Sequence, residues 1–452
     1  MKILFVENRY FTWILEAVAK ELIALGHDIH WIVQNPMFTP SVGNVHIMPF
    51  PKAGGAMMKD SDLRTRLQES DRGVRWFGGD GSHWQTYHDH INRIIGDVVP
   101  DVVFSEVTQF HELLTSHICQ QRGIPLLSPN VTRYPVGRLN FFEYNTMNPV
   151  GGEGIDLSDN EAEQMLNAIV GRTIQPSYME KVHRSQLALF NNMLKDKLRI
   201  LIGWCRGERY ITPSPLTKIR LERLHARQYQ RWESFAHKTL PTTLNQSPWV
   251  LLPLQMQPEA NIEVWGSPWS DQTALVQRTA KALAAIGAVL VVKPNPKSKY
   301  ELTAELCAVV EQAPNIVAIS HTTSMKDIFA QAPLVMTVTG TVLMECIFAG
   351  KPVASLGTHV MTRYPGVQAI DAPEDVAQKL LAVIRNEIQG ANKAEAKNLL
   401  NSLYKNSYPA MTWDPYTRPE LMTENNIAEL SLAFSDVINL STCVNQNSIY
   451  RK

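Results

Sequence analysis

Short apolar runs alternate with helical patterns from the first residues of the chain. A run at Lys2–Val6 is followed by a helical pattern with apolar residues on one side, which ends near Gly26. A second apolar run follows at 29–33. Continuous apolar runs of this length are typical of strands buried on both faces of a parallel sheet. The opening therefore predicts a βαβ unit, although no GxGxxG lies between its first strand and helix and the dinucleotide-binding fingerprint is absent.

The alternation is interrupted between about residues 50 and 90, where two glycine-rich stretches occur at 52–55 and 76–81. A long insert of this kind in a compact domain is either mobile or functional. The pattern then resumes with a helix over 90–98, a strand at 102–104, a helix over 110–121 and a strand at 124–127. We expect a loop over 137–155 and polar helices over 157–200.

A second α/β alternation begins after 241–248, a Pro-Thr-Thr-Leu-Asn-Gln-Ser-Pro stretch with the composition of a linker. Five further strands are predicted, with helices between them, at 250–252, 288–292, 316–319, 334–338 and 353–356. The pattern predicts an α/β protein with two Rossmann-like domains, an amino-terminal domain over 1–240 and a second over 246–372. A helical tail over 373–452 is expected to pack across both domains.

Composition excludes several classes of function. Lys+Arg and Asp+Glu are balanced at 43 each, so no net field favours nucleic acid as a partner. The five cysteines are far apart and form no CxxC, which disfavours a disulfide framework and a structural zinc site. Neither a signal peptide nor a run of about 18 apolar residues is evident, so the expected compartment is the cytoplasm.

Two of the loops that follow predicted strands of the second domain contain polar groups suited to a ligand. Ligands of open α/β sheets bind outside the carboxyl ends of the strands. Gln255, Gln257 and Glu259 follow the strand at 250–252 in a turn with two prolines, and amide groups both donate and accept hydrogen bonds. Lys293 and Asn295 follow the next strand, where the lysine could face a phosphate. An ordinary polar surface turn is the alternative in each case.

The third strand-end loop is the most informative. Thr339-Gly340-Thr341 lies between an apolar strand and a helix, so free backbone N–H groups and the helix dipole meet there. This is a ready-made anion site, and glycine permits close approach of a phosphate. Glu345, one turn into the helix, could accept hydrogen bonds from ribose hydroxyls. The alternative is a simple helix cap followed by a surface glutamate.

The three loops, in this order and spacing, resemble the bacterial capsule-polysaccharide and surface-carbohydrate biosynthesis family, which includes Kdo transferases built on the GT-B plan. The matching segments are LLPLQMQPEANIEVWG, VVKPNP and VTVTGTVLMECIFAGKPVASLG, within about 110 residues of the second domain. The resemblance implies a GT-B-like fold, two Rossmann-like domains facing a cleft. It also implies a glycosyltransferase that uses no bound metal or other cofactor.

In this family a nucleotide-sugar donor is held mainly by the second domain and a glycan or lipid-linked glycan acceptor mainly by the first. CMP-Kdo or another nucleotide-sugar is the implied donor, and a capsule or O-antigen polysaccharide the implied product. Where relatives commonly have Lys-Glu-His-Pro, this chain has Asn295 in place of the histidine, and asparagine cannot carry a positive charge. A nucleotide-sugar epimerase on the same plan and a non-catalytic sugar-binding subunit are the alternatives.

The first domain is expected to provide a carboxylate or basic group, as nucleophile or as general base on the acceptor hydroxyl. Glu106 is the first choice because the strand at 102–104 ends beside it. His111 and Asp80 are lesser catalytic candidates, the latter in the glycine-rich insert. Arg133 could bind a donor or acceptor carboxylate in a bidentate manner.

The stretch 216–238 predicts a basic amphipathic helix that contains Arg220, Arg223, Arg227 and Arg231. Such a helix could rest on anionic lipid and give peripheral association with the inner face of the cytoplasmic membrane. Glu222 and Glu233 interrupt its basic residues, and a solvated or interdomain helix is the alternative.

Overall fold

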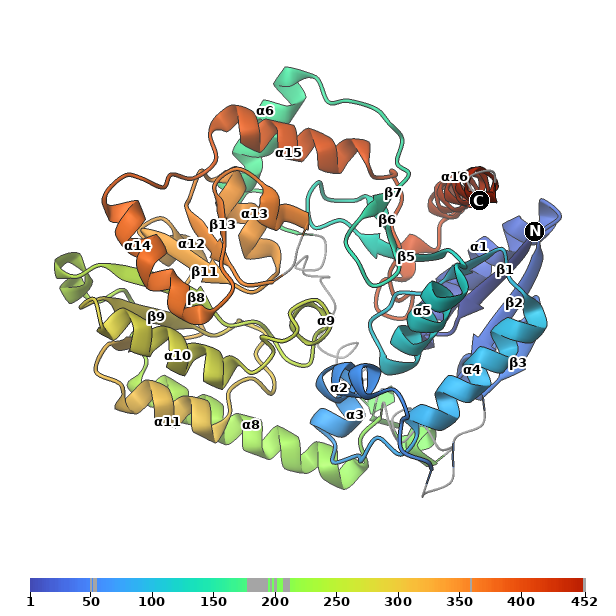
Figure 1. Ribbon diagram of the computed structural model, residues 1–452, viewed down its shortest axis with the longest axis horizontal. Coiled ribbons are helices and arrows are strands. Elements are labelled where there is room, and N and C mark those ends of the chain that lie inside the picture. The colour runs from blue at the N-terminus through green and yellow to red at the C-terminus, as the bar shows by residue number, and fades with distance from the viewer. Residues whose placement is uncertain are drawn as a thin grey trace. The chain divides into compact units, whose positions relative to one another are not determined.

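The computed structural model describes residues 1–48, 51, 55–176, 194–195, 197–198, 201–205, 212–357 and 360–449 (Figure 1). The chain divides into two compact units, each described here by itself. Unit 1 comprises Met1–Ser158, Gln175–Pro215 and Leu400–Lys452, and unit 2 comprises Asp159–Ile174 and Leu216–Leu399.

Unit 1 is built on a seven-stranded sheet of order β3-β2-β1-β4-β5-β6-β7. The strands from β1 to β5 are parallel, whereas β6 and β7 pair antiparallel at one edge. The strands are β1 (Lys2–Val6), β2 (Asp28–Val33), β3 (Asn44–Ile47), β4 (Val102–Phe104), β5 (Leu126–Val131), β6 (Leu139–Glu143) and β7 (Pro149–Val150). The helices are η1 (Arg9–Phe11), α1 (Thr12–Ala24), η2 (Pro36–Phe38), α2 (Ser61–Ser70), α3 (Arg72–Arg75), α4 (Trp84–Val98), α5 (Phe110–Arg122), η7 (Pro419–Leu421) and α16 (Glu424–Ile449).

Aromatic rings form the centre of the unit 1 core. The ring of Phe5 stacks on that of Trp31 at 4.8 Å between centroids, and Phe104 packs at 4.7 Å against Phe434 of α16. All four side chains are fully buried. The apolar runs predicted for β1, β2 and β4 therefore form a core that the carboxyl-terminal helix completes.

Unit 2 contains a six-stranded sheet of order β10-β9-β8-β11-β12-β13, in which every pair is parallel. The strands are β8 (Trp249–Pro253), β9 (Val289–Lys293), β10 (Ile316–Ala318), β11 (Leu334–Thr337), β12 (Val353–Ser355) and β13 (Val367–Ala369). The helices are α6 (Asp159–Val170), α8 (Pro215–Phe235), η4 (Thr242–Gln246), α9 (Ala260–Glu263), α10 (Gln272–Ala284), α11 (Ala304–Gln312), α12 (Met325–Phe329), α13 (Thr341–Phe348), η5 (Val360–Arg363), η6 (Pro373–Asp375), α14 (Val376–Ile384) and α15 (Lys393–Lys405). The last of these begins in unit 2 and ends in unit 1.

These two sheets confirm the predicted α/β class with two Rossmann-like units. The prediction of a loop over 137–155 is wrong, because this segment contains the strands β6 and β7. Leu139 and Phe141, on either side of Asn140, are both buried in the unit 1 core. The glycine-rich insert contains α2 and α3, and β13 was not predicted. Of the polar helices expected over 157–200, α6 is present, and most of the remainder lies outside the described residues.

The units are divided differently from the predicted domains. The predicted first domain included α8 and ended at 240, yet α8 belongs to unit 2 because its Trp232 is fully buried in the unit 2 core. The segment 159–174 also belongs to unit 2. The predicted tail is split, since α14 lies in unit 2 whereas α16 packs on α1 in unit 1. Within the described part of the chain, no helix has the length and hydrophobicity needed to cross a membrane.

Candidate functional site

The three predicted strand-end loops of unit 2 lie together at the carboxyl-terminal ends of its parallel strands. They follow β9, β8 and β11, which are neighbours in the sheet, and parallel strands end at the same edge. The Leu254 N–H donates to the Lys293 carbonyl at 2.8 Å, and the Gln255 Nε2 donates to the Thr339 carbonyl at 2.6 Å. The sequence-predicted loops therefore form one contiguous surface.

Gly340 turns the chain from β11 into α13. Its φ of +98° and ψ of 177° are values that residues with a side chain rarely adopt, and a Cβ here would lie 3.3 Å from the Gln255 Nε2. The preceding Thr339 is 1% exposed, and its hydroxyl donates to the Asn261 carbonyl at 2.7 Å. Thr341 begins the helix. The Leu343 N–H donates to the Gly340 carbonyl at 3.2 Å, and the dipole of α13 gives its first turn a positive potential suited to an anion.

Gln257 is buried and stabilises the loop after β8 through hydrogen bonds. It is 2% exposed, its Nε2 donates to the Ser270 carbonyl at 3.0 Å, and its Oε1 accepts from the Gln272 Nε2 at 3.0 Å. Its backbone N–H donates to the Glu301 carboxylate at 3.1 Å, and burial raises the pKa of this glutamate. The side chain predicted to bind a ligand is thus committed to the protein interior, as is the hydroxyl of Thr339.

Glu259 and Asn295 each have a polar group that no described residue binds and that could therefore bind a ligand. The Glu259 carboxylate, at the start of α9, has no hydrogen bond or ion pair with any described residue. The Asn295 Oδ1 accepts from the Lys297 N–H at 2.8 Å, whereas none of the described residues accepts from its Nδ2. Both side chains are partly exposed at the loop edge.

Lys293 is more buried than the sequence indicated. It is 3% exposed, and its Nζ donates to the carbonyls of Pro294 and His321 at 3.2 and 3.3 Å. Burial lowers its pKa to about 8, against the opposing effect of the nearby Glu233 carboxylate. It can act on a bound phosphate as a positive charge beneath the loop, while its hydrogen bonds hold the ends of β9 and β10 together.

A Glu233–His321 pair lies beside this lysine and was not found from the sequence. His321 follows β10, and its Nδ1 lies 2.7 Å from the Glu233 Oε1 while its ring packs 4.2 Å from that of Tyr229. Burial would raise the pKa of Glu233, but hydrogen bonds from Ser320 and His321 lower it. The strand-end rule that located the other loops could have identified His321.

Glu345 forms an ion pair with Arg172 at 2.7 Å. The arginine follows α6, which packs against α13, and its guanidinium lies 5.4 Å from the Phe329 ring centre. Nothing local in the sequence indicates this pairing, because the two residues belong to distant segments. An arginine within reach of the α13 surface adds a positive group that the sequence analysis did not assign to the site.

Unit 1 has its own polar cluster at the carboxyl ends of β1 and β4. The Asn8 Nδ2 donates to the Glu106 Oε2 at 2.6 Å and to the buried Glu112 Oε1 at 3.4 Å. The Gln109 Nε2 donates in turn to the Asn8 Oδ1 at 2.7 Å. Burial and the Glu112 carboxylate raise the pKa of Glu106 to about 8. A partly exposed carboxyl with such a pKa can gain or lose a proton near neutral pH, which suits general acid–base chemistry.

The other unit 1 candidates differ in access. His111 is 1% exposed with its Nε2 3.1 Å from the Glu7 carbonyl, so its burial favours a packing role over the predicted catalytic one. Asp80 is exposed and accepts from the Ser82 N–H at 3.0 Å, and this hydrogen bond lowers its pKa. Arg133 lies two residues after β5 and is partly exposed. Catalytic or binding roles for Asp80 and Arg133 stay predictions.

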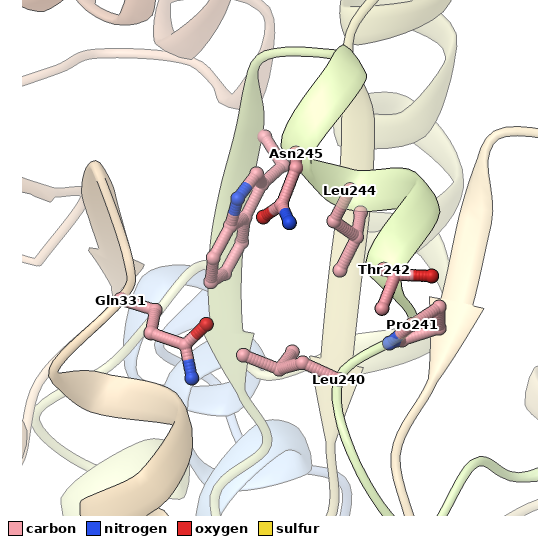
Figure 2. Close-up of a pocket in the computed structure, with 7 residues that line it drawn as sticks. Leu240, Pro241, Thr242, Leu244, Asn245 and Gln331 are labelled. Atoms are coloured by element: carbon pink, nitrogen blue, oxygen red, sulfur yellow. The ribbon is translucent and has the colours of Figure 1, made fainter.

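A small pocket lies at the opposite, amino-terminal ends of the unit 2 strands. It lies at the start of β8 and is lined by Leu240, Pro241, Thr242, Leu244, Asn245, Trp249 and Gln331 (Figure 2). Its volume of about 110 Å³ is well below that of ordinary ligand sites. We therefore place no nucleotide in it. Among the residues that the structure describes, no group of three or more His, Cys, Asp or Glu side chains could hold a metal ion.

No protein-family model matches the chain, and no curated protein matches it. It is similar to solved structures, among them UDP-GlcNAc 2-epimerase of Methanocaldococcus jannaschii with UDP-GlcNAc and UDP (12% identity, TM-score 0.30, covering 89% of this chain and 99% of that chain). Others are the UDP-GlcNAc 2-epimerase of Neisseria meningitidis bound to UDP-GlcNAc (11%, 0.30, 90% and 100%) and the calicheamicin glycosyltransferase CalG4 (14%, 0.28, 97% and 98%). Since these TM-scores are below 0.5, the fold class rests on the chain's own two sheets.

Proposed function

We propose that the protein is a glycosyltransferase that moves a sugar from a nucleotide-activated donor to a bacterial surface glycan. The observation that carries this proposal is the loop between β11 and α13, where Gly340 precedes the helix and lies beside Gln255 and Thr339. Gly340 has no side chain that could block a phosphate, and the helix dipole favours negative charge there. The resemblance of these loops to surface-carbohydrate transferases supports a polysaccharide as the product.

In this proposal, the donor phosphate lies at the first turn of α13. The buried charge of Lys293 adds positive potential as the phosphate departs with the nucleotide. Arg172, held in place by its ion pair with Glu345, helps to bind the donor. The Glu259 carboxylate, which has no partner among the described residues, accepts from sugar or ribose hydroxyls, and the Asn295 amide donates to the nucleotide. CMP-Kdo is the donor that the resemblance favours, with another nucleotide-sugar as the alternative.

Unit 1 binds the acceptor glycan, and Glu106 takes part in the reaction. As a general base, its carboxylate removes the proton from the attacking acceptor hydroxyl; as a nucleophile, it forms a transient bond to the sugar. In either role Glu106 must be ionised, and its pKa of about 8 places this ionisation above neutral pH. The rate of transfer should therefore rise with pH up to about 8.

A thermal-shift panel of CMP, UDP, GDP and dTDP tests the donor site. At least one nucleotide should raise the melting temperature, and Gly340→Ala should abolish this shift. Gly287→Ala is the matched control, because Gly287 also has positive φ (+67°) but lies at the opposite edge of the sheet, before β9. A shift that survives Gly340→Ala would place the nucleotide elsewhere.

Product analysis by mass spectrometry separates transfer from epimerisation. With donor alone, a transferase leaves the nucleotide-sugar largely intact, and added acceptor then consumes it. Conversion of the donor sugar into its epimer without acceptor would identify an epimerase. If no nucleotide or nucleotide-sugar binds at all, the non-catalytic alternative is favoured and the proposed activity fails.

A further inference from the structure

The first half of α8 exposes large apolar side chains. Leu216 is 80% exposed, Ile219 46% and Leu224 47%, although the end of the same helix buries Trp232 completely. Figure 1 shows α8 beside α11, and the Arg231 guanidinium donates to the Ala304 carbonyl at 3.2 Å, where α11 begins. The helix is therefore anchored at its carboxyl-terminal end, while its amino-terminal half presents apolar groups to solvent.

Arginines alternate with these apolar residues. Arg220, Arg223 and Arg227 are exposed, and none of them has an ion pair or hydrogen bond with a described residue. Arg231, one turn further on, differs because it pairs with Glu311 at 2.7 Å. Three arginines without a carboxylate partner among the described residues keep their full charge available to an external anion.

These six residues share one face of the helix. At roughly 100° per residue they fall within an arc of about 140°, and Trp232 lies almost opposite its centre. On the amino-terminal part of this arc lie Leu216, Ile219, Arg220, Arg223, Leu224 and Arg227. Arg231 also falls within the arc further along the helix, where it pairs with Glu311. We name the first six residues the α8 face.

The acidic residues of the helix lie off the α8 face. Glu222 falls roughly 60° beyond the edge of the arc. Glu233 is turned toward unit 2, where its carboxylate accepts from the Ser320 hydroxyl at 2.6 Å and the His321 N–H at 3.0 Å. The two glutamates that interrupt the basic pattern in the sequence therefore do not neutralise the face in the structure.

We propose that the α8 face binds an anionic bilayer surface. Arginines beside a membrane are attracted to lipid phosphates, and leucine and isoleucine side chains at the same depth enter the boundary between headgroups and acyl chains. A nucleic-acid backbone would attract the arginines equally but would leave three large apolar side chains without a partner. The inference rests on α8 alone and is independent of the proposed reaction.

Co-sedimentation of the full chain with lipid vesicles tests this proposal. The protein should bind vesicles of phosphatidylcholine mixed with phosphatidylglycerol, and bind poorly to phosphatidylcholine alone. The combined Arg220→Gln, Arg223→Gln and Arg227→Gln variant should lose roughly a hundredfold in its partition coefficient. Leu216→Ser with Leu224→Ser should weaken binding about tenfold or more. These side chains are exposed, so circular dichroism should show folded variants.

The matched control removes three charges elsewhere. Lys20, Arg93 and Arg385 are 54%, 62% and 61% exposed, lie outside α8 and each have a carboxylate partner. Changing all three to Gln should alter binding by no more than about twofold. Equal loss in the two triple variants, or wild-type protein that stays in solution with anionic vesicles, overturns the proposal. So does duplex DNA that binds through the three arginines when vesicles do not.

Discussion

Glu106→Gln separates the proposed chemistry from folding. The amide keeps the shape of the side chain, and its oxygen can still accept from the Asn8 Nδ2, which donates to Glu106 at 2.6 Å. It cannot ionise, so it can act neither as base nor as nucleophile. We expect transfer to fall by about 10²–10⁴-fold.

The same substitution should stabilise the protein at high pH. The pKa of Glu106 is raised from 4.5 to about 8, so the folded protein holds a proton that the unfolded chain releases between these values. Stability is therefore full below about pH 4.5 and falls as pH rises toward 8. A change of this size corresponds to at most about 5 kcal/mol. Because Glu106 is partly exposed, solvent screening reduces the expected effect to roughly 2 kcal/mol.

Thermal denaturation at about pH 5 and about pH 9 measures this effect. Glu106→Gln should melt near the wild-type temperature at the lower pH and roughly 4–8 °C above it at the higher pH. Glu143→Gln, which alters an exposed carboxyl on β6, serves as the control and should show no such pH-dependent gain. If both variants follow the wild-type protein at both pH values, the burial and charge argument for Glu106 is wrong.

Three further substitutions test unit 2. Thr339→Val leaves the Asn261 carbonyl without its 2.7 Å hydrogen bond and should cost about 1–3 kcal/mol in urea denaturation; unchanged stability would contradict the buried contact. Arg172→Gln removes the partner of Glu345 and should raise the donor KM by about tenfold with kcat little changed, whereas an equal fall in kcat would refute a binding role. Lys293 has its pKa lowered from 10.5 to about 8, so wild-type stability should rise between these values. Lys293→Met should lack that rise in melting temperature, and a parallel rise would argue against the buried ammonium.

The location of the candidate site in unit 2 could be predicted from the sequence, because it depends only on where the parallel strands end. Parallel strands end at a common edge, so Gln255, Lys293 and Gly340 had to be near one another once their strands were recognised. The strand-end rule does not tell which side chains face a ligand. Ser270 and Gln272 hold the side chain of Gln257, and Asn261 holds the hydroxyl of Thr339. The hydrophobic pattern of the sequence does not indicate such partners.

Two contacts of the candidate sites were not predicted because they join segments that are distant in the sequence. Arg172 pairs with Glu345 because the chain contributes residues 159–174 to unit 2 before it goes back to unit 1 at Gln175. Asn8 follows β1 and becomes a partner of Glu106 through the pairing of β1 with β4. A short apolar run predicts such strands but does not predict which strands pair. The order of strands in the sheet is therefore needed before the site can be assembled.

Hydrogen exchange with the nucleotide that binds most tightly tests the central claim most directly. The account predicts slower exchange on binding in three segments of unit 2, at 254–261, 293–301 and 337–345. The segment 240–249, which contributes most of the small pocket at the opposite edge, should exchange at an unchanged rate. Protection confined to that segment or to unit 1, with the three loops unaffected, would contradict a nucleotide site at Gly340.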